Sequence, residues 1–248
     1  MSLLRFKFII LLACLPFIGV AQTLRVAVAA NAQFVAEKLA QAFKKQSGIE
    51  AQLIISSSGK LTTQIEQGAP FDVFLSADMK YPQKLHEKKL TTAAPKVYAY
   101  GSLVIWSKTN ITFSKNLSGL NNAAIKKIAI ANPKLAPYGT AAEEAMQKTN
   151  IWNVLKSKLV YGESIAQVNQ YLLTGNVDAV FTAKSVVLDP AQRGVGRWTE
   201  VDSKLYQPIA QGVVVLKASQ GKNFAANKFY QFLFSAQAKQ IFKAYGYW

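Results

Sequence analysis

The stretch "TLRVAVAANAQFVAEKLAQAFKKQSGIEAQLIISSS" (23–58) indicates the fold class of the whole chain. It begins with a short apolar run, after which Val35, Leu39 and Phe43 recur every four residues. Apolar residues at this spacing share one face of a helix. A second apolar run follows Gly48, and glycine commonly ends a helix. The stretch therefore predicts a strand, a helix and a second strand, the unit from which parallel sheets with packed helices are built.

The same alternation continues to the C-terminus. Apolar runs that predict strands lie at 71–78, 100–107, 126–132, 158–164, 178–183 and 208–216. With helical patterns between most of them, the chain is expected to be an α/β protein of two lobes, each a mostly parallel sheet flanked by helices. We expect one lobe to comprise 22–103 and 208–248 and the other 104–207, with a ligand cleft between the lobes.

The N-terminus has the pattern of a secretory signal peptide. Arg5 and Lys7 precede an apolar run at 8–20, and small residues up to Ala21 suit a signal peptidase. The run is too short to span a bilayer, which takes roughly 20 residues. We expect residues 1–21 to be removed after Ala21 and the protein to be periplasmic. A lipid anchor at Cys14 is the less favoured alternative, because the apolar run continues beyond this cysteine.

The chain is strongly basic. It has 29 Lys and Arg against 13 Asp and Glu, a formal net charge of +16. Such a balance favours anionic partners. The basic residues are spread from Arg25 to Lys243 instead of forming one run, so nucleic acid is not an expected partner. Lysines that only keep the surface solvated are an equally good explanation of the charge.

Small or polar residues occupy four points at which a predicted strand leads into a helix. They are Ala30 and Asn31, Ser57 and Ser58, Tyr138 and Gly139, and Ser164 and Ile165. In open α/β sheets ligands bind at the carboxyl ends of strands, and the first turn of a helix offers backbone N–H groups to anions. The four turns therefore predict a cage of hydrogen-bond donors. Helix capping alone is the alternative at each turn, since Asn31 and Ser58 are favourable cap residues in any protein.

The sequence gives little support for catalysis. His86 is the only histidine and lies in a polar helical stretch, and the only cysteine lies in the signal peptide. Histidine-based triads and zinc sites of cysteine and histidine therefore have little basis. Asp72 and Asp78 flank one predicted strand, so an exported α/β enzyme with an acid and base pair is kept as an alternative. Capping of the following helix is the simpler role for Asp78.

Several stretches of the chain resemble the periplasmic molybdate-binding proteins of bacterial ABC importers, which are type II periplasmic binding proteins. The resemblance is carried by "VAVAANAQFVAEKLAQAF", "SSSGKLTTQIEQGAPFDVFLSAD", "YGSLVIWS", "IAIANPKLAPYGTAAEEA" and "IFKAYGY". It extends over essentially all of the chain after the signal peptide, and "QIEQGAPFDVFLSAD" (64–78) is its most specific part.

The resemblance implies a set of contacts to a bound oxyanion. These are Asn31, Ser58, Tyr138 and Ile165, with Ala30 and Thr182 as further candidates. Tyr138 and Ile165 would act through backbone N–H groups, and Ser58 through its hydroxyl and N–H. Many family members have serine in place of Asn31 and tyrosine in place of Thr182, so the chain departs at both positions. One branch of the family has the asparagine together with the "APYG" turn.

The resemblance further implies an exported, monomeric solute-binding protein without enzymatic activity or cofactor. It would bind molybdate, and tungstate, between its lobes and deliver the anion to an inner-membrane ABC permease. Molybdenum would be present only as the bound oxyanion, without direct protein ligands. Three alternatives stay open: the same fold binding sulfate, phosphate or another small anion, the exported enzyme described above, and a basic module that binds an acidic surface.

Overall fold

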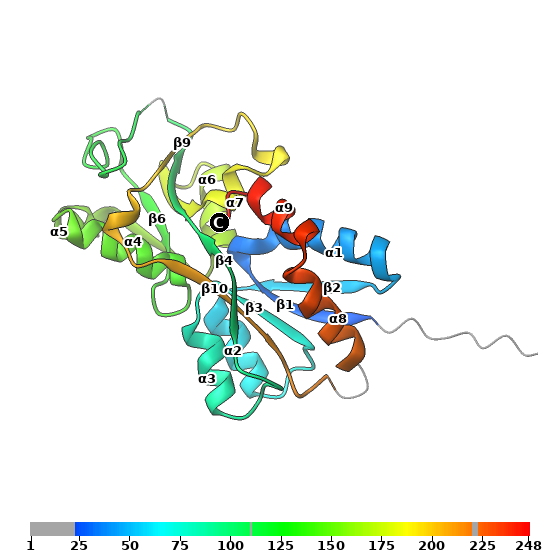
Figure 1. The fold of residues 1–248 in the computed structure, drawn as a ribbon. Helices are drawn as coiled ribbons and strands as arrows, with labels where there is room; N and C mark the ends of the chain where they lie inside the picture. Colours follow the sequence, from blue (N-terminus) through cyan, green and yellow to red (C-terminus); the bar gives the residue numbers. More distant parts are fainter. Residues whose placement is uncertain (1–22, 110, 220–222) are drawn as a thin grey trace, which may run out of the picture.

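Alternating strands and helices form two five-stranded sheets (Figure 1). The computed structural model describes residues 23–109, 111–219 and 223–248. The predicted signal peptide, its cleavage after Ala21 and the possible anchor at Cys14 lie outside the described residues. Among the helices that are described, none combines the length and the apolar character needed to cross a membrane.

The first sheet combines the N-terminal strands with one late strand. Its order is β2 (Ala51–Ser56), β1 (Leu24–Ala29), β3 (Val73–Ser76), β10 (Ile209–Val215) and β4 (Lys96–Gly101). The associated helical segments are η1 (Ala30–Ala32), α1 (Gln33–Ser47), α2 (Ser58–Glu66), α3 (Lys80–Glu87), α8 (Asn223–Leu233) and α9 (Ala236–Ala244).

Helices cover both faces of this sheet. Val26 and Val28 of β1 pack in a cluster with Phe43 of α1, whereas Ala27 between them packs with Leu61 of α2. Successive side chains of a strand point to opposite faces, so two separate apolar clusters form on one strand. This explains why β1 is a nearly continuous apolar run, as is typical of a sheet that is buried on both faces.

The second sheet has the order β7 (Leu159–Gly162), β6 (Ile128–Ala131), β8 (Ala179–Ala183), β5 (Leu103–Ser107) and β9 (Arg197–Glu200). Its helices are α4 (Pro137–Lys148), α5 (Trp152–Leu155), α6 (Ile165–Leu173) and α7 (Lys184–Val187). Short 3-10 segments are η2 (Lys156–Lys158), η3 (Pro190–Gln192) and η4 (Ser203–Leu205). The helices α4 and α6 contact β6 and β8, and together with buried side chains of β5 they build one apolar core.

The α/β architecture with two helix-flanked sheets is confirmed, but each sheet is mixed instead of mostly parallel. In the first sheet β1 pairs in parallel with β2 and β3, whereas β10 is antiparallel to β3 and β4. The second sheet repeats this arrangement, with parallel pairs at β6 and antiparallel pairs at β5. The antiparallel strands are those by which the chain enters one sheet from the other.

The strand register shows where these crossings lie. Leu103, the first residue of β5, pairs with Ala183 at the end of β8, and Ile209, the first residue of β10, pairs with Gly101 at the end of β4. The chain therefore crosses between the sheets at the carboxyl ends of the parallel strands. Figure 1 shows β4 and β10 side by side in this central region. Loops at the carboxyl ends of both sheets can consequently meet.

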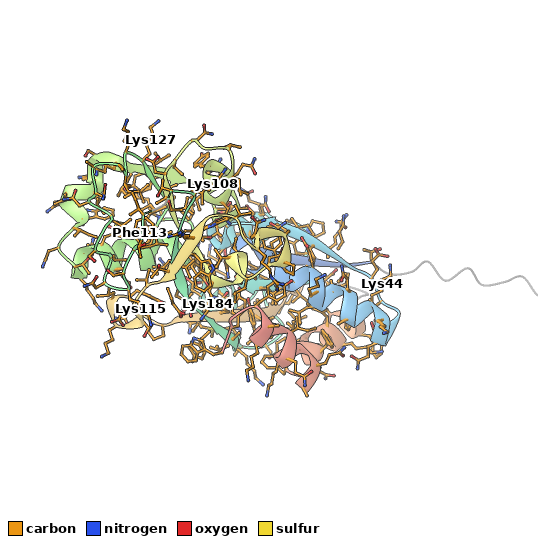
Figure 2. All side chains as sticks on the ribbon, turned by 90° about the horizontal axis from the view of Figure 1, so that it is seen from above. Lys44, Lys108, Phe113, Lys115, Lys127 and Lys184 are labelled. Carbon is orange, nitrogen blue, oxygen red and sulfur yellow. The ribbon has the colours of Figure 1, made fainter. Side chains whose placement is uncertain are left out.

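Lysine side chains are distributed over the whole molecule. Figure 2 labels Lys44 at one end, Lys127 and Lys115 at the other, and Lys108 and Lys184 between them. The described ion pairs that join lysine to glutamate lie at least partly exposed to solvent. The labelled lysines thus do not gather in one stripe, in agreement with their spread along the sequence.

Candidate functional site

A small cavity lies where helix starts from both sheets meet. Its walls are formed by Ala29, Ala30, Asn31, Ser57, Ser58, Ala77, Ala136, Pro137, Tyr138 and Ile165. All of these residues are uncharged. The structure therefore brings together five of the six predicted contact residues, Thr182 being the exception.

The first wall is the start of η1. Ala30 and Asn31 are buried and lie in the first turn, so their N–H groups have no acceptor within the helix. The segment lies beside α6 and α7 of the second sheet. The Asn31 side chain makes hydrogen bonds of its own, since its Nδ2 atom donates to Gln211 and to Tyr247.

Ser58 forms the second wall, at the start of α2. Its Oγ atom accepts a hydrogen bond of 3.0 Å from the backbone N–H of Ala77. Because the oxygen acts as acceptor in this contact, the hydroxyl proton is available to donate elsewhere. The neighbouring Ser57 caps the helix by accepting the N–H of Lys60 over 3.4 Å. The two serines thus have separate roles, and Ser58 keeps both its hydroxyl proton and its first-turn N–H.

The third wall is the start of α4, where the "APYG" turn lies. Pro137 is the first helical residue and has no N–H, and the N–H of Gly139 donates to Ala136 over 2.9 Å. Tyr138, between them, has a first-turn N–H without an acceptor within the helix. A side chain at Gly139 would place Cβ only 2.0 Å from the carbonyl oxygen of Ala131. Since Pro137 has no N–H and the N–H of Gly139 is already bonded, the N–H of Tyr138 is the donor that this turn offers to the cavity.

The fourth wall is the start of α6. Ser164 caps the helix by accepting the N–H of Gln167 over 3.3 Å. Ile165 is the first helical residue and is buried, and its N–H lies in the first turn as well. Each of the four helix ends also carries the partial positive charge of its dipole, which favours a bound anion.

Thr182 lies apart from the cavity. It is a buried residue of β8 that pairs with Val104 of β5. Its hydroxyl oxygen has no hydrogen-bond partner among the described residues. Thr182 is a candidate because of its position in the family pattern. In this structure its short side chain does not line the cavity.

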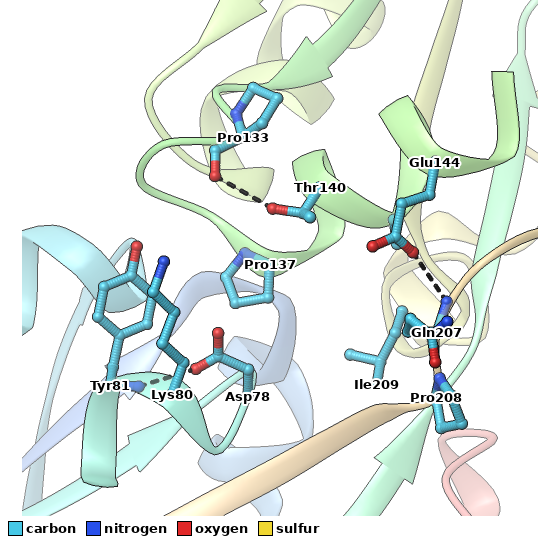
Figure 3. Close-up of a pocket in the computed structure, with 11 residues that line it drawn as sticks. Asp78, Lys80, Tyr81, Pro133, Pro137, Thr140, Glu144, Gln207, Pro208 and Ile209 are labelled. Atoms are coloured by element: carbon cyan, nitrogen blue, oxygen red, sulfur yellow. Dashed lines mark hydrogen bonds between the residues drawn. The ribbon is translucent and has the colours of Figure 1, made fainter. Parts of the chain in front are cut away.

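A second, larger cavity adjoins the first and shares Pro137 with it (Figure 3). Asp78 lines it, and burial raises the pKa of this carboxyl above its usual value, although hydrogen bonds from the Tyr81 N–H and the Ser76 hydroxyl oppose the shift. Across the cavity, Glu144 accepts the N–H of Gln207 over 2.8 Å. Both carboxylates are thus engaged in local structure.

The candidate acid and base pair does not come together. Asp72 lies before β3 and accepts the N–H of Arg25 over 2.7 Å, whereas Asp78 lies after the end of β3 and accepts the N–H of Tyr81, in the first turn of α3, over 3.3 Å. The four-residue strand β3 lies between them and spans roughly 13 Å. His86 is exposed, and its Nδ1 atom contacts the hydroxyl of Thr91 at 2.8 Å. The structure therefore offers no acid and base pair among these residues.

Contacts between the two sheets surround the small cavity. The N–H of Gly59 donates to the carbonyl of Leu135 over 2.9 Å, and the hydroxyl of Tyr81 donates to the carbonyl of Lys134 over 3.1 Å. An ion pair joins Lys60 of α2 to Glu163, just before α6. These contacts hold the helix starts of the two sheets against one another.

Comparison with known proteins gives the family. A family model described as bacterial extracellular solute-binding protein matches residues 24–248. The chain belongs to this family. Members of such families are transport components without enzymatic activity, which sets aside the alternative of an exported enzyme.

Among solute-binding proteins, the chain is similar to molybdate-binding protein ModA of Azotobacter vinelandii, with 39% identity over 96% of this chain and 93% of that protein. ModA of Rhodobacter capsulatus is 38% identical over 89% of this chain and 86% of that protein. The solved structure of the Azotobacter vinelandii periplasmic molybdate-binding protein matches with a TM-score of 0.86 and 31% identity, over 91% of this chain and 98% of that one.

Two residues that the sequence reasoning did not single out take part in this site. Ala77 lines the cavity directly after β3, and Gln211 of β10 bonds the side chain of Asn31. Ala77 could have been found by extending the rule on carboxyl ends of strands to β3. Gln211 had a weaker signal: it is a polar residue within the apolar run 208–216.

Proposed function

We propose that this solute-binding protein binds molybdate, and also tungstate, in the cavity between Asn31, Ser58, Tyr138 and Ile165. One observation carries the proposal: four helix starts, from both sheets, line one uncharged cavity with backbone N–H groups that have no acceptor within their helices. The names of its relatives from Azotobacter vinelandii and Rhodobacter capsulatus support molybdate as the ligand. The residue contacts themselves are a proposal from geometry.

Neutral donors suffice to hold a dianion in such a cavity. A buried charge is costly unless several hydrogen bonds compensate for its lost hydration. Hydrogen bonds to a charged acceptor are about twice as strong as neutral ones, and the four helix dipoles add to them. The cavity thus requires no lysine or arginine in contact with the ligand. A ligand held in this way is bound without any change in the protonation of the protein.

Sulfate and phosphate are the nearest alternatives within the same function. Both are tetrahedral oxyanions, and the sulfate-binding protein SubI of Mycobacterium tuberculosis has a similar fold, with a TM-score of 0.74 at 15% identity. The lining residues include no carboxylate that could accept the proton of hydrogen phosphate. A lining without carboxylates favours a fully deprotonated anion, although the side-chain oxygen of Asn31 is an acceptor that hydrogen phosphate could use. The choice between molybdate and sulfate depends on the size of the anion.

We further propose that residues 22–103 with 208–248, and residues 104–207, act as two lobes that close on the anion. The contacts of Gly59 with Leu135 and of Lys60 with Glu163 would form on closure. In this scheme the protein acts as a periplasmic monomer and delivers the anion to an inner-membrane ABC permease. Opening of the lobes at the permease would break these contacts and release the ligand.

Titration of the chain from Gln22 onward with four anions tests the proposal. Molybdate, tungstate, sulfate and phosphate are compared by isothermal titration calorimetry and by melting temperature. A ligand at 100 times its Kd stabilises the folded state by about 2.7 kcal/mol, so a tight ligand raises the melting temperature. We expect a rise with molybdate and tungstate. Sulfate or phosphate as the tighter ligand would replace molybdate in the proposal, and no response to any anion would refute anion binding.

A further inference from the structure

Asn31 is held at both its side chain and its backbone by residues far away in the sequence. Its Nδ2 atom donates to Oε1 of Gln211 over 2.9 Å and to the hydroxyl of Tyr247 over 3.1 Å. Its carbonyl oxygen accepts the hydroxyl of Ser185 over 2.6 Å. All four residues are buried. Both amide hydrogens of Asn31 therefore already have acceptors within the protein.

Gln211 links two walls of the cavity. It is fully buried in β10, and besides accepting from Asn31 it directs Nε2 at the carbonyl of Ala77 over 3.4 Å. The N–H of Ala77 in turn donates to Oγ of Ser58. A buried glutamine must have partners because an unpaired amide is costly to bury. Two of its partners, Asn31 and Ala77, line the cavity; the others are the Tyr98 hydroxyl, which donates to Oε1 over 3.4 Å, and the carbonyl of Ile209.

Tyr247 links Asn31 to the second sheet. Its hydroxyl contacts the Ser185 hydroxyl at 3.2 Å and the Asn31 carbonyl at 3.3 Å, and Ser185 belongs to α7. The nearby Tyr245 makes a different contact between the sheets, donating to the carboxylate of Asp189 over 3.1 Å. The end of the chain thus reaches both the cavity wall and the second sheet.

We propose that Gln211 and Tyr247 are positioning residues of the oxyanion site, which act on the ligand through Asn31. By accepting both amide hydrogens of Asn31 they fix this residue, and hence its backbone N–H, before the anion arrives. Donors that are already oriented bind more tightly because no ordering cost remains at the moment of binding. This inference rests on the proposed function of the same cavity.

A double-mutant cycle tests whether Gln211 acts through Asn31. Gln211→Met keeps the approximate volume and removes the acceptor, and molybdate affinity is measured by calorimetry for the parent, Gln211→Met, Asn31→Ala and the double variant. We expect Gln211→Met to bind about tenfold more weakly, the effect of a lost hydrogen bond that leaves a buried donor unpaired. The double variant should bind no more weakly than Asn31→Ala alone. Fully additive losses, or an unchanged affinity of Gln211→Met, would overturn the inference.

Gln211→Glu is the conservative variant that separates positioning from packing. The neutral acid keeps an oxygen that can accept from Asn31, whereas the ionised form places a negative charge beside the anion. The tyrosines near Gln211 are Tyr98, Tyr138 and Tyr247. Burial raises the pKa of each, so their hydroxyls stay neutral near pH 7. Asp78, whose carboxyl lines the larger cavity, meets β10 through its backbone at Gly212. We expect affinity near that of the parent at about pH 6. An affinity as weak there as that of Gln211→Met would overturn the inference.

Tyr247→Phe and Tyr245→Phe form a matched pair. Each removes one buried hydroxyl that contacts the second sheet, but only Tyr247 bonds Asn31. We expect Tyr247→Phe to weaken molybdate binding several-fold more than Tyr245→Phe, with no further loss when Asn31→Ala is added. Equal losses in the pair would show that the contact between the sheets, and not the orientation of Asn31, is what matters. A parent protein that binds no anion would refute the proposed function itself, whereas a binding parent with unaffected variants refutes the positioning role alone.

Discussion

The backbone N–H of Gly59 donates to the carbonyl oxygen of Leu135 over 2.9 Å, which joins α2 of the first sheet to the turn before α4 of the second. Gly59 directly follows Ser58, and Leu135 lies three residues before Tyr138. The contact therefore connects two walls of the cavity on either side of the gap between the sheets. A Cβ at this position would lie 2.9 Å from the Tyr81 hydroxyl and 3.0 Å from the Leu135 oxygen, so any side chain here would push these two neighbours away.

Gly59→Ala should weaken molybdate binding. The added methyl group pushes against Leu135 and Tyr81, so the two sheets cannot approach as closely, and we expect a loss of about 1.4 kcal/mol, or tenfold in Kd. The ligand-free protein should not lose stability in parallel, since alanine favours a helix over glycine by about 1 kcal/mol. Calorimetry and the melting temperature without ligand measure both quantities. The exposed Gln64→Ala on the same helix is the control, and an equal affinity of the two variants would contradict the role of this contact.

Ser58→Ala should weaken the affinity for molybdate by about 1.5 to 3 kcal/mol, because it removes a hydroxyl donor from a desolvated charge. Ser235→Ala is the control, because Ser235 caps α9 by accepting the N–H of Ala238 and does not line the cavity. This control should cost only helix stability, about 1 kcal/mol. If both variants bind molybdate as the parent does, Ser58 is a structural residue and not a ligand.

Molybdate affinity should be nearly independent of pH between about 6.5 and 8.5. None of the lining residues has a side chain that titrates in this range, and the dianion itself does not change charge there. His86 is exposed on α3 away from the cavity, so His86→Ala should bind as the parent does. Calorimetry at constant ionic strength measures the profile. A tenfold change across the window would mean that a titrating group contacts the ligand.

Alkaline pH should destabilise the protein through its buried tyrosines. Burial raises the pKa of Tyr247 to about 12, against about 10 in an unfolded chain. A raised pKa means that the folded state favours the neutral phenol. The stability that Tyr247 contributes is therefore fully present below about pH 10 and is lost as the pH rises towards 12, a change on the order of 2 kcal/mol. Urea unfolding at several pH values should show a shallower alkaline loss for Tyr247→Phe, and parallel curves would contradict this assignment.

The helix starts at the cavity could be predicted because each carries a local signal. Pro137 before Tyr138 and Gly139 after it restrict the turn to one available N–H, and Ser58 follows β2 and the capping Ser57. These signals depend only on neighbouring residues. The rule on carboxyl ends of strands then predicts that such turns come together, as five of the six candidate residues do.

Long-range partners could not be predicted in the same way. Gln211 and Tyr247 contact Asn31 across 180 and 216 residues of sequence, and no local pattern specifies such a pairing. The antiparallel direction of β10 likewise depends on whether the chain enters the first sheet at the carboxyl or the amino ends of its parallel strands. The apolar run alone does not reveal this. Thr182, a candidate from its position in the family pattern, does not line the cavity, and its contact with the ligand stays a prediction.

A crystal structure of the protein with molybdate, with molybdenum located by its anomalous scattering, tests the central claim most directly. The account predicts one molybdenum peak in the cavity, with oxyanion oxygens within hydrogen-bond distance, about 2.7–3.2 Å, of the N–H groups of Asn31, Ser58, Tyr138 and Ile165 and of the Ser58 hydroxyl. No lysine, arginine or histidine side chain should contact the anion. A peak in the larger cavity beside Asp78, or one coordinated by a charged side chain, would contradict the account.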